Sequence, residues 1–209
     1  MEKKNRRTDT LAAQLAGHIL SGNWPEGSKL PSDDTLCDEF GVSRTVIREA
    51  FRLLGAKGLL EARPRRGTHV AAKSQWSLFD ADLLQWLDAC GALERFLPDI
   101  DDIRVALEPS FAAMAAARAD EPANQALQQA LRDLQDAPSP VSEINFLRAL
   151  FFACGNDLAL ASLPLVRIAI RYRSNLAPLA AYGKMTAAIA QKDPMGARQA
   201  ALQALIGEA

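Results

Sequence analysis

The chain has 209 residues, a formal net charge of −1 and an apolar fraction of 49%, which exclude an intrinsically disordered polypeptide and allow one large domain or two smaller ones. The polar start MEKKNRR lacks the apolar run of a secretory signal, and no window is long enough to span a membrane, so we expect a cytoplasmic protein. The three cysteines, Cys37, Cys90 and Cys154, lack any C-x-x-C spacing and are expected to be reduced.

Charge is distributed unevenly along the chain. Residues 1–73 carry 13 Lys and Arg against 9 Asp and Glu, a net charge of +4, while the remaining 136 residues carry 11 against 16, a net charge of −5. A basic front part and an acidic back part suggest two domains with different partners. We place a first domain at residues 1–75 and a second at residues 76–209.

The front part begins with two predicted helices. Apolar residues recur at helical spacing at Leu11, Leu15 and Ile19. Gly22 follows where this first helix would stop. Ser32 can cap a second helix, with Asp33 and Asp34 in its first turn, where the helix dipole favours negative charge. Gly41 lies just past the end of that helix.

A third predicted helix, capped by Ser43, has two chemically different faces. One half of its helical wheel holds Val46, Ile47, Ala50, Phe51 and Leu54, and the other half holds Arg44, Thr45, Arg48, Glu49 and Arg52. Two helices joined by a tight glycine turn, the second with arginine at its N-terminal end, are typical of a helix-turn-helix. An arginine pair at i, i+4 suits DNA because each guanidinium can bond a guanine edge or a phosphate with two hydrogen bonds.

Two short strands are predicted next, in LLEARP and GTHVAA, around a turn at residues 64–67. The turn carries Arg65 and Arg66, and Gly67 permits close approach of the backbone, as in a wing that contacts a minor groove or phosphates. A charged helix face by itself usually indicates only a solvated surface. The glycine turn, the capping serines and the basic hairpin, in this order, together favour DNA binding.

The back part is predicted to be all helical. Candidate helices lie at roughly 77–89, 99–119, 121–136, 141–154, 157–175, 178–191 and 193–206, separated mainly by prolines and glycine. Short connections between such helices predict an antiparallel bundle. The expected fold class is therefore mainly α, with an N-terminal winged helix-turn-helix that has a small β-hairpin wing, and a C-terminal all-α antiparallel helical bundle.

Several segments resemble a known family. The stretch LPSDDTLCDEFGVSRTVIREAFRLLGAKGLLEARPRRGTHVA resembles the winged-helix signature of the GntR family of bacterial transcription regulators. DIRVALEPSFAAMAAARA, FFACGNDLAL and AAIAQKDPMGARQAAL resemble the FCD-type ligand domain of its FadR subfamily, and QWSLFDADLLQWL resembles regulators of sugar-acid catabolism. The resemblance implies a homodimer that reads a pseudo-palindromic operator in double-stranded DNA, with effector binding and dimerisation in the helical domain.

The resemblance also implies which residues contact DNA. The matching positions are Ser43, Arg44, Thr45, Arg48, Arg66 and Gly67. One position departs from the family pattern, because Asp34 stands where relatives often have arginine. A carboxylate cannot bind phosphate, so either this contact is absent or the operator differs.

The family's metal site is not expected in this chain. Many members bind a divalent metal with an Asp-x-x-x-His pair and two later histidines, and the corresponding positions here are Glu143, Leu147, Tyr182 and Ala204. The only histidines are His18 and His69, both in the front part, so we expect no metal and no cofactor. The candidate effector-binding residues are instead Arg104, Glu143, Arg171 and Tyr182, with Arg104 meeting a carboxylate.

We therefore expect a sequence-specific DNA-binding regulator, a repressor of a catabolic operon controlled by a small organic acid such as a sugar acid. An alternative is a dimeric DNA-binding regulator that needs no effector, which the missing metal ligands and the short segments near 137–141 and 172–182 favour. A remote alternative is an enzyme built on the helical domain. That domain holds no histidine, and Cys154 in the apolar run ALFFACG is expected to be a core residue, so no nucleophile with a base is predicted.

Overall fold

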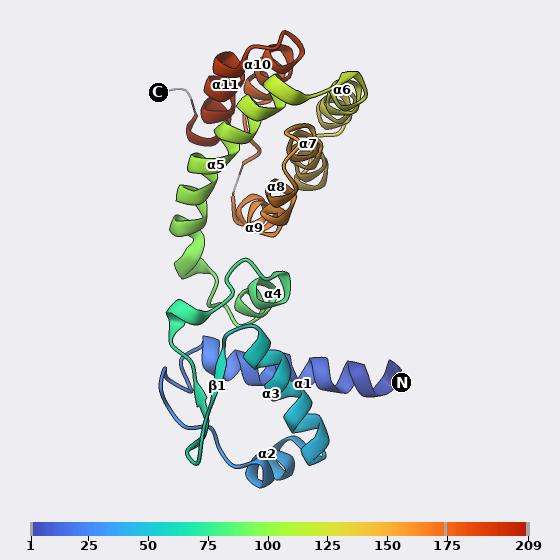
Figure 1. The fold of residues 1–209 in the computed structure, drawn as a ribbon. Helices are drawn as coiled ribbons and strands as arrows, with labels where there is room; N and C mark the ends of the chain where they lie inside the picture. The colour runs from blue at the N-terminus through green and yellow to red at the C-terminus, as the bar shows by residue number, and fades with distance from the viewer. Residues whose placement is uncertain (1, 174, 208–209) are drawn as a thin grey trace. The chain divides into compact units, whose positions relative to one another are not determined.

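The computed structural model describes residues 2–173 and 175–207 and divides the chain into two compact units, one ending at Arg95 and one beginning at Phe96 (Figure 1). The fold is mainly α, as predicted: a winged helix-turn-helix with a two-stranded hairpin, followed by an all-helical bundle. None of the helices in the described residues combines the length and the hydropathy that crossing a membrane requires.

The first unit contains four α-helices and the hairpin. In chain order these are α1 (Glu2–Leu20), α2 (Asp33–Phe40), α3 (Arg44–Ala56), β1 (Leu60–Arg63), β2 (Gly67–Val70), the short 3-10 helix η1 (Lys73–Gln75) and α4 (Ala81–Ala89). Helix α1 packs against both α3 and α4, and α2 packs against α3. The apolar residues predicted at helical spacing in α1 are all buried, at 0–3% exposure. The buried apolar face of α1 is therefore the surface against which α3 and α4 pack.

The hairpin is an antiparallel pair in which Leu60 faces Val70 and Arg63 faces Gly67. A third extended segment lies along its other side, because the Leu30 amide donates to the carbonyl of Thr68 and the Val70 amide donates to that of Ser28, both at 2.9 Å. Strand β2 is therefore paired on both sides, and of the two hairpin strands β1 keeps the open edge.

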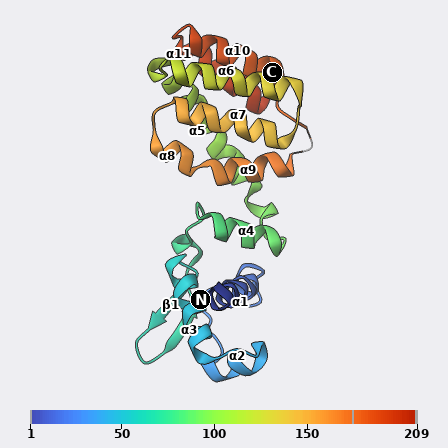
Figure 2. The same cartoon turned by 90° about the vertical axis from the view of Figure 1, so that its right-hand side faces the viewer.

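In the described part of the second unit, residues 96–173 and 175–207, seven α-helices follow one another. They are α5 (Leu97–Arg118), α6 (Glu121–Asp136), α7 (Pro140–Ala153), α8 (Asp157–Ala161), α9 (Leu163–Tyr172), α10 (Leu179–Ala190) and α11 (Pro194–Ile206). Helix α11 packs against α5 and α10, and α7 lies between α6 and α9, which Figure 2 shows as a stack. A second short 3-10 helix, η2 (Glu94–Phe96), precedes α5.

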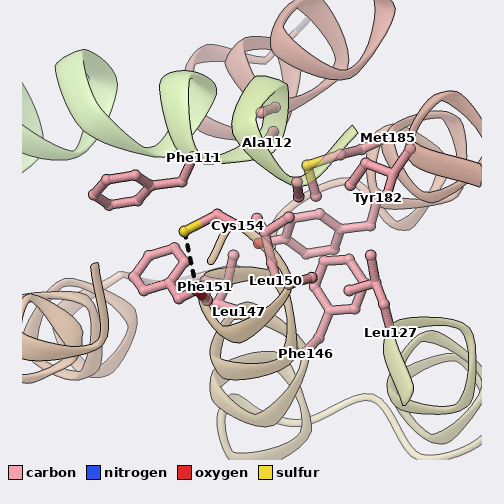
Figure 3. Close-up of a cluster of buried hydrophobic side chains, with 14 of the residues drawn as sticks. Phe111, Ala112, Leu127, Phe146, Leu147, Leu150, Phe151, Cys154, Tyr182 and Met185 are labelled. Carbon is pink, nitrogen blue, oxygen red and sulfur yellow. Dashed lines mark hydrogen bonds between the residues drawn. The ribbon is translucent and has the colours of Figure 1, made fainter. Parts of the chain in front are cut away.

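Aromatic side chains from three helices form the core of this unit (Figure 3). Phe111 of α5 meets Phe151 of α7 edge to face, with ring centroids 5.0 Å apart, and Phe146 of α7 lies 4.6 Å from the ring of Tyr182 on α10. Cys154 is buried among them, and its thiol donates to the carbonyl of Phe151 at 3.0 Å. This thiol is a core residue, as predicted.

Some boundaries differ from those predicted, and the helix expected at 77–89 begins only at Ala81. The helix expected at 157–175 is two helices, because Ser162 ends α8 and begins α9 and Pro164 has no amide hydrogen with which to continue the hydrogen-bond ladder. Residues 76–95, which the sequence analysis assigned to the second domain, belong to the first compact unit. The physical reason is the apolar face of α4, whose Leu83, Leu84 and Leu87 are buried. Hydrophobic contact thus ties α4 to the winged helix.

The junction between α3 and α4 requires glycine at position 58. Gly58 has a φ of 74°, and a Cβ built on it would lie 1.9 Å from the carbonyl oxygen of Gln75. Beside it, the buried Lys57 ammonium donates to Asp80 at 2.6 Å and to Asp82 at 2.8 Å, and lies 5.3 Å from the ring centre of Trp86. The backbone at this junction therefore has no space for a side chain.

We expect Gly58→Ala to lower the free energy of unfolding of the first unit by at least about 2 kcal/mol, because the left-handed backbone and the clash both act against alanine. The matched control is Gly55→Ala in α3, where the nearest atom to an added Cβ is 3.7 Å away and alanine is the better helix former. Urea denaturation followed by tryptophan fluorescence isolates this unit, which holds Trp24, Trp76 and Trp86, the only tryptophans in the chain. Equal denaturation midpoints for Gly58→Ala and Gly55→Ala would contradict the requirement for glycine at position 58.

Candidate DNA interface and buried polar cluster

The helix-turn-helix is built by short-range signals in the sequence. The Ser32 hydroxyl accepts from the Thr35 amide at 3.2 Å at the start of α2, and Gly41 ends that helix in the left-handed conformation, with φ 62° and ψ 37°. Ser43 stands at the N-cap of α3, but its side chain makes no capping hydrogen bond and is exposed. Its hydroxyl therefore faces solvent at the N-terminal end of α3, where an anion is favoured.

Helix α3 buries one face and exposes the other, as its periodicity predicts. The buried residues are Val46, Ile47, Ala50 and Leu54, with Phe51 half-buried. On the opposite face, Arg44, Thr45 and Arg48 are all exposed. Because the apolar face packs on the α1 side of the unit, the basic face points outward with its rotation about the helix axis fixed.

The two outward arginines are paired with carboxylates of α2. Arg44 lies 2.5 Å from Asp34, and Arg48 lies 3.4 Å from Asp33. Both pairs are solvent-exposed, with side-chain exposures of 65% and 66% for the first, so each stabilises the fold by no more than about 1 kcal/mol. From the sequence, Asp34 was expected in the first turn of α2 and as a lost phosphate contact. Its pairing with Arg44 was not predicted, because it depends on how α2 and α3 cross.

The tip of the hairpin exposes a second basic element. Arg65 and Arg66 are exposed, and Arg65 adopts a φ of 61°, which few non-glycine residues do. Gly67 is exposed, with a φ of 91°. A Cβ at Gly67 would lie 3.2 Å from the Lys29 side chain, so glycine keeps both the turn and the neighbouring segment in place. His69 is 8% exposed, so the basic side chains that the hairpin tip exposes are Arg65 and Arg66.

The second unit contains a buried cluster of charged and polar side chains. Glu143 of α7 is fully buried, and its Oε1 atom accepts from the Tyr182 hydroxyl at 2.6 Å and from Arg173 at 2.5 Å. Arg104 and Glu108, one turn apart on α5, are each 4% exposed. Arg104 donates to Glu108 through Nε at 2.5 Å and through Nη2 at 3.4 Å. Four elements thus meet at two ion pairs in the helical core.

These groups influence one another's protonation. Burial raises the pKa of Glu108, and the charge of Glu143 acts in the same direction, while Arg104 and Arg173 oppose it. Burial and the neighbouring Glu143 carboxylate raise the pKa of Tyr182 well above its usual value, so this side chain is a neutral hydrogen-bond donor. The Glu143 atom Oε2 is buried and has no hydrogen-bond partner among the described residues.

Three of the four predicted effector residues lie in this cluster: Arg104, Glu143 and Tyr182. The fourth, Arg171, is exposed in the last turn of α9. Arg173, two residues later, reaches Glu143 instead, because α9 ends at residue 172 and the chain changes direction there. The sequence shows only Arg-Tyr-Arg at this place, and which arginine turns inward depends on where the helix ends. Glu108 was also missed, although its i, i+4 spacing from Arg104 is a recognisable signal.

The residues present do not fit the metal site that the family resemblance implies. Leu147 and Ala204 are buried and offer no ligand atom, and Glu143 already accepts from Tyr182 and Arg173. Within residues 2–173 and 175–207, no three His, Cys, Asp or Glu side chains gather where they could hold an ion. Arg173 here supplies the positive charge next to the one carboxylate that remains.

A small cavity lies beside the Arg104–Glu108 pair, between α5 and α9. Its volume is about 10 Å³, and its walls include Ile103, Phe111 and Val166. A volume of this size holds about one water molecule. In this conformation the cavity is therefore too small for a sugar acid.

Comparisons with known proteins agree with this architecture. The bacterial regulatory proteins of the gntR family match residues 7–70, and the FCD domain matches residues 99–206. The chain is 37% identical over 128 residues to the galactonate operon transcriptional repressor of Escherichia coli (strain K12), a match covering 61% of this chain. The same match covers 56% of that repressor, so the chain spans little more than half the length of this curated relative.

Two further relatives are matched nearly end to end. The HTH-type transcriptional regulator Mce2R of Mycobacterium tuberculosis (strain CDC 1551 / Oshkosh) is 30% identical over 212 residues, which cover 90% of this chain and 84% of that protein. The solved structure of Streptococcus agalactiae GntR has a TM-score of 0.54 and 28% identity, and covers 95% of this chain and 97% of its own. The chain therefore belongs to the GntR family of bacterial regulatory proteins, in the FadR subfamily that carries an FCD domain.

Proposed function

We propose that this regulator is a cytoplasmic homodimeric repressor of a catabolic operon, that it reads a pseudo-palindromic operator, and that a small organic acid bound by its helical unit controls it without a metal. The observation that carries the DNA-reading part is the outward face of α3, where Arg44, Thr45 and Arg48 are exposed opposite a fully packed apolar face. A dimer would place two such helices in successive major grooves, about 34 Å apart.

The proposed contacts divide into two kinds. The forks of Arg44 and Arg48 suit base edges in the major groove, and the exposed hydroxyls of Ser43 and Thr45 suit phosphate oxygens. Arg66 and Gly67 at the hairpin tip suit the backbone or a minor groove. On DNA, Asp33 and Asp34 would give up their arginine partners or hold them at a fixed angle.

The proposed effector is a small carboxylate, and a sugar acid is the first to be tried. The relative named for the galactonate operon supports this class, as does Arg104 in the helical core. A second candidate function is regulation without any effector. The cavity of about 10 Å³ and the pairing of Arg104 with Glu108 favour this alternative.

We expect the double variant Arg44→Ala with Arg48→Ala to bind its operator at least about 30-fold more weakly, since each lost base contact costs about 1–3 kcal/mol. Genomic fragments selected by the wild-type protein supply the operator, and fluorescence anisotropy at fixed salt gives the dissociation constant. The matched control is Arg132→Ala, an exposed arginine of α6 in the helical unit. Operator binding that survives the double change unaltered would refute the assignment of α3 as the reading helix.

We expect Asp34→Asn to raise the affinity for non-operator DNA roughly fivefold, because two unit charges 4 Å apart in water interact by about 1 kcal/mol. The change removes a negative charge facing the phosphates and frees Arg44. The ratio of operator to non-operator affinity should fall. The control Glu39→Gln removes an exposed charge elsewhere on α2. If Asp34→Asn and Glu39→Gln have the same affinities for operator and non-operator DNA, the effect comes from net charge alone. The Asp34–Arg44 pair then has no role in specificity.

The effector is tested by thermal unfolding of the full chain with galactonate, other hexonates, hexuronates and lactate, each with and without zinc. A ligand at a hundred times its Kd stabilises the native state by about 2.7 kcal/mol, which is readily detected. We expect at least one organic acid to raise the Tm and zinc to have no effect. Stabilisation by none of them would favour the effector-independent alternative, and a rise that requires zinc would contradict the absence of a metal site.

A further inference from the structure

The Arg104–Glu108 pair is arranged like an anion-binding site whose anion belongs to the protein. Arg104 presents Nε and Nη2, the two donors with which a guanidinium grips a carboxylate, and both go to the two oxygens of Glu108. The pair adjoins the cavity between α5 and α9, which Arg104 and Glu108 themselves line. Asp101 makes only a longer contact with the same guanidinium, at 3.8 Å.

We propose that Glu108 occupies the carboxylate site of this regulator from within, and that an external carboxylate binds Arg104 by exchange with Glu108. The inference rests on the proposed function, because it concerns the same control site and names the ligand class and the condition for its entry. It also accounts for a volume of only about 10 Å³ beside a buried arginine: the Glu108 side chain fills the place that the ligand would take.

The charges around the site decide what must accompany the exchange. Glu108 is surrounded by Arg104 and Asp101 on α5, Glu143 on α7, Arg173 after α9, and the neutral Tyr182 on α10. The other charged side chains of the helices packed against α5 lie at the surface: Arg148 of α7, Arg167 and Arg171 of α9 and Lys184 of α10 are exposed, and Arg198 of α11 donates to Ser110 at 3.2 Å. The cluster therefore balances two buried glutamates against the buried Arg104 and the half-buried Arg173.

A carboxylate entering this balanced set would add one buried negative charge, which is costly in a core of low polarity. The charge is neutralised if Glu108 takes one proton from solvent as it leaves Arg104. Glu108 is suited to this, because burial and the nearby Glu143 already raise its pKa. Binding then takes up one proton, and the apparent affinity rises about tenfold for each unit by which the pH falls, as long as the pH is above the pKa of Glu108.

The cavity walls indicate the rest of the ligand. Apart from Arg104, Glu108 and Ser162, they are apolar: Ile103, Leu107, Phe111, Leu165 and Val166. Hydroxyl groups would be left without partners against such walls, whereas a short hydrocarbon chain would be favoured by about 0.8 kcal/mol per buried methylene. The site therefore fits a small monocarboxylate with an apolar body better than a polyhydroxylated acid.

The test is isothermal titration calorimetry of the full chain with acetate, propionate, butyrate and galactonate. Glu108→Gln keeps the shape of the side chain and an acceptor for Arg104 but removes the competing charge. We expect this variant to bind propionate or butyrate at least about tenfold more tightly than the wild type near neutral pH, because the competent fraction of the site is no longer limited by Glu108. The control is Glu121→Gln, which removes an exposed charge from α6 of the same unit.

Proton uptake separates exchange from simple binding. Titrations in two buffers of different ionisation enthalpy should show about one proton taken up per carboxylate by the wild type and none by Glu108→Gln. Adding Arg104→Gln to Glu108→Gln should abolish binding while leaving the helical content, measured by circular dichroism, unchanged. Because an uncharged pair replaces an ion pair, this double variant leaves no buried charge unpaired at these two positions.

Three results would overturn the proposal: no binding of any of the four acids to Glu108→Gln, equal affinity and equal proton uptake in the variant and the wild type, or binding that persists without Arg104. None of these readouts involves DNA. Operator binding that responds to none of the acids would count against control by organic acids in the proposed function, and the carboxylate exchange would still be decided by the calorimetry alone.

Discussion

The apolar face of α3 is the constraint on which the proposed DNA-reading surface depends. A helix of 13 residues has one orientation in which Val46, Ile47, Ala50 and Leu54 are all withdrawn from water. Burial of the three larger side chains stabilises the fold by about 1.5–3 kcal/mol each. In that orientation Arg44 and Arg48 lie on the solvent-exposed face of the helix. The direction of the arginine side chains is thus set by burial of the apolar face, and it does not depend on an ion pair.

The second unit buries a group of charged side chains in its core, whereas the basic face of α3 in the first unit is exposed. A buried ion pair recovers its desolvation cost only when geometry and further hydrogen bonds are good, so it is weak evidence for stability. The Glu143 atom Oε1 has such hydrogen bonds, from Tyr182 and Arg173, whereas Oε2 has none among the described residues. Polar groups kept in a core at such cost are expected at sites that bind or switch. The cluster around Glu143 and Arg104 is therefore the candidate binding site of the helical unit.

The junction after α3 is joined to α4 by two ion pairs and one close backbone contact. Lys57 binds two carboxylates at the start of α4, and Gly58 allows the backbone of residue 75 to pass at a distance that excludes any side chain. These contacts join α4 to the end of α3 within the first unit.

The sequence by itself determined the fold class, the helix-turn-helix with its hairpin and the faces of α3, because these depend on periodicity, capping residues and turn glycines that act over a few residues. It also indicated that a three-histidine metal site is impossible, which composition alone decides. Only the tertiary structure decided that α4 belongs with the first unit, that Asp34 reaches Arg44, and that Arg173 rather than Arg171 turns toward Glu143. Each of these depends on where separate elements meet in space, and side chains 10 or 30 residues apart carry no local signal of that meeting.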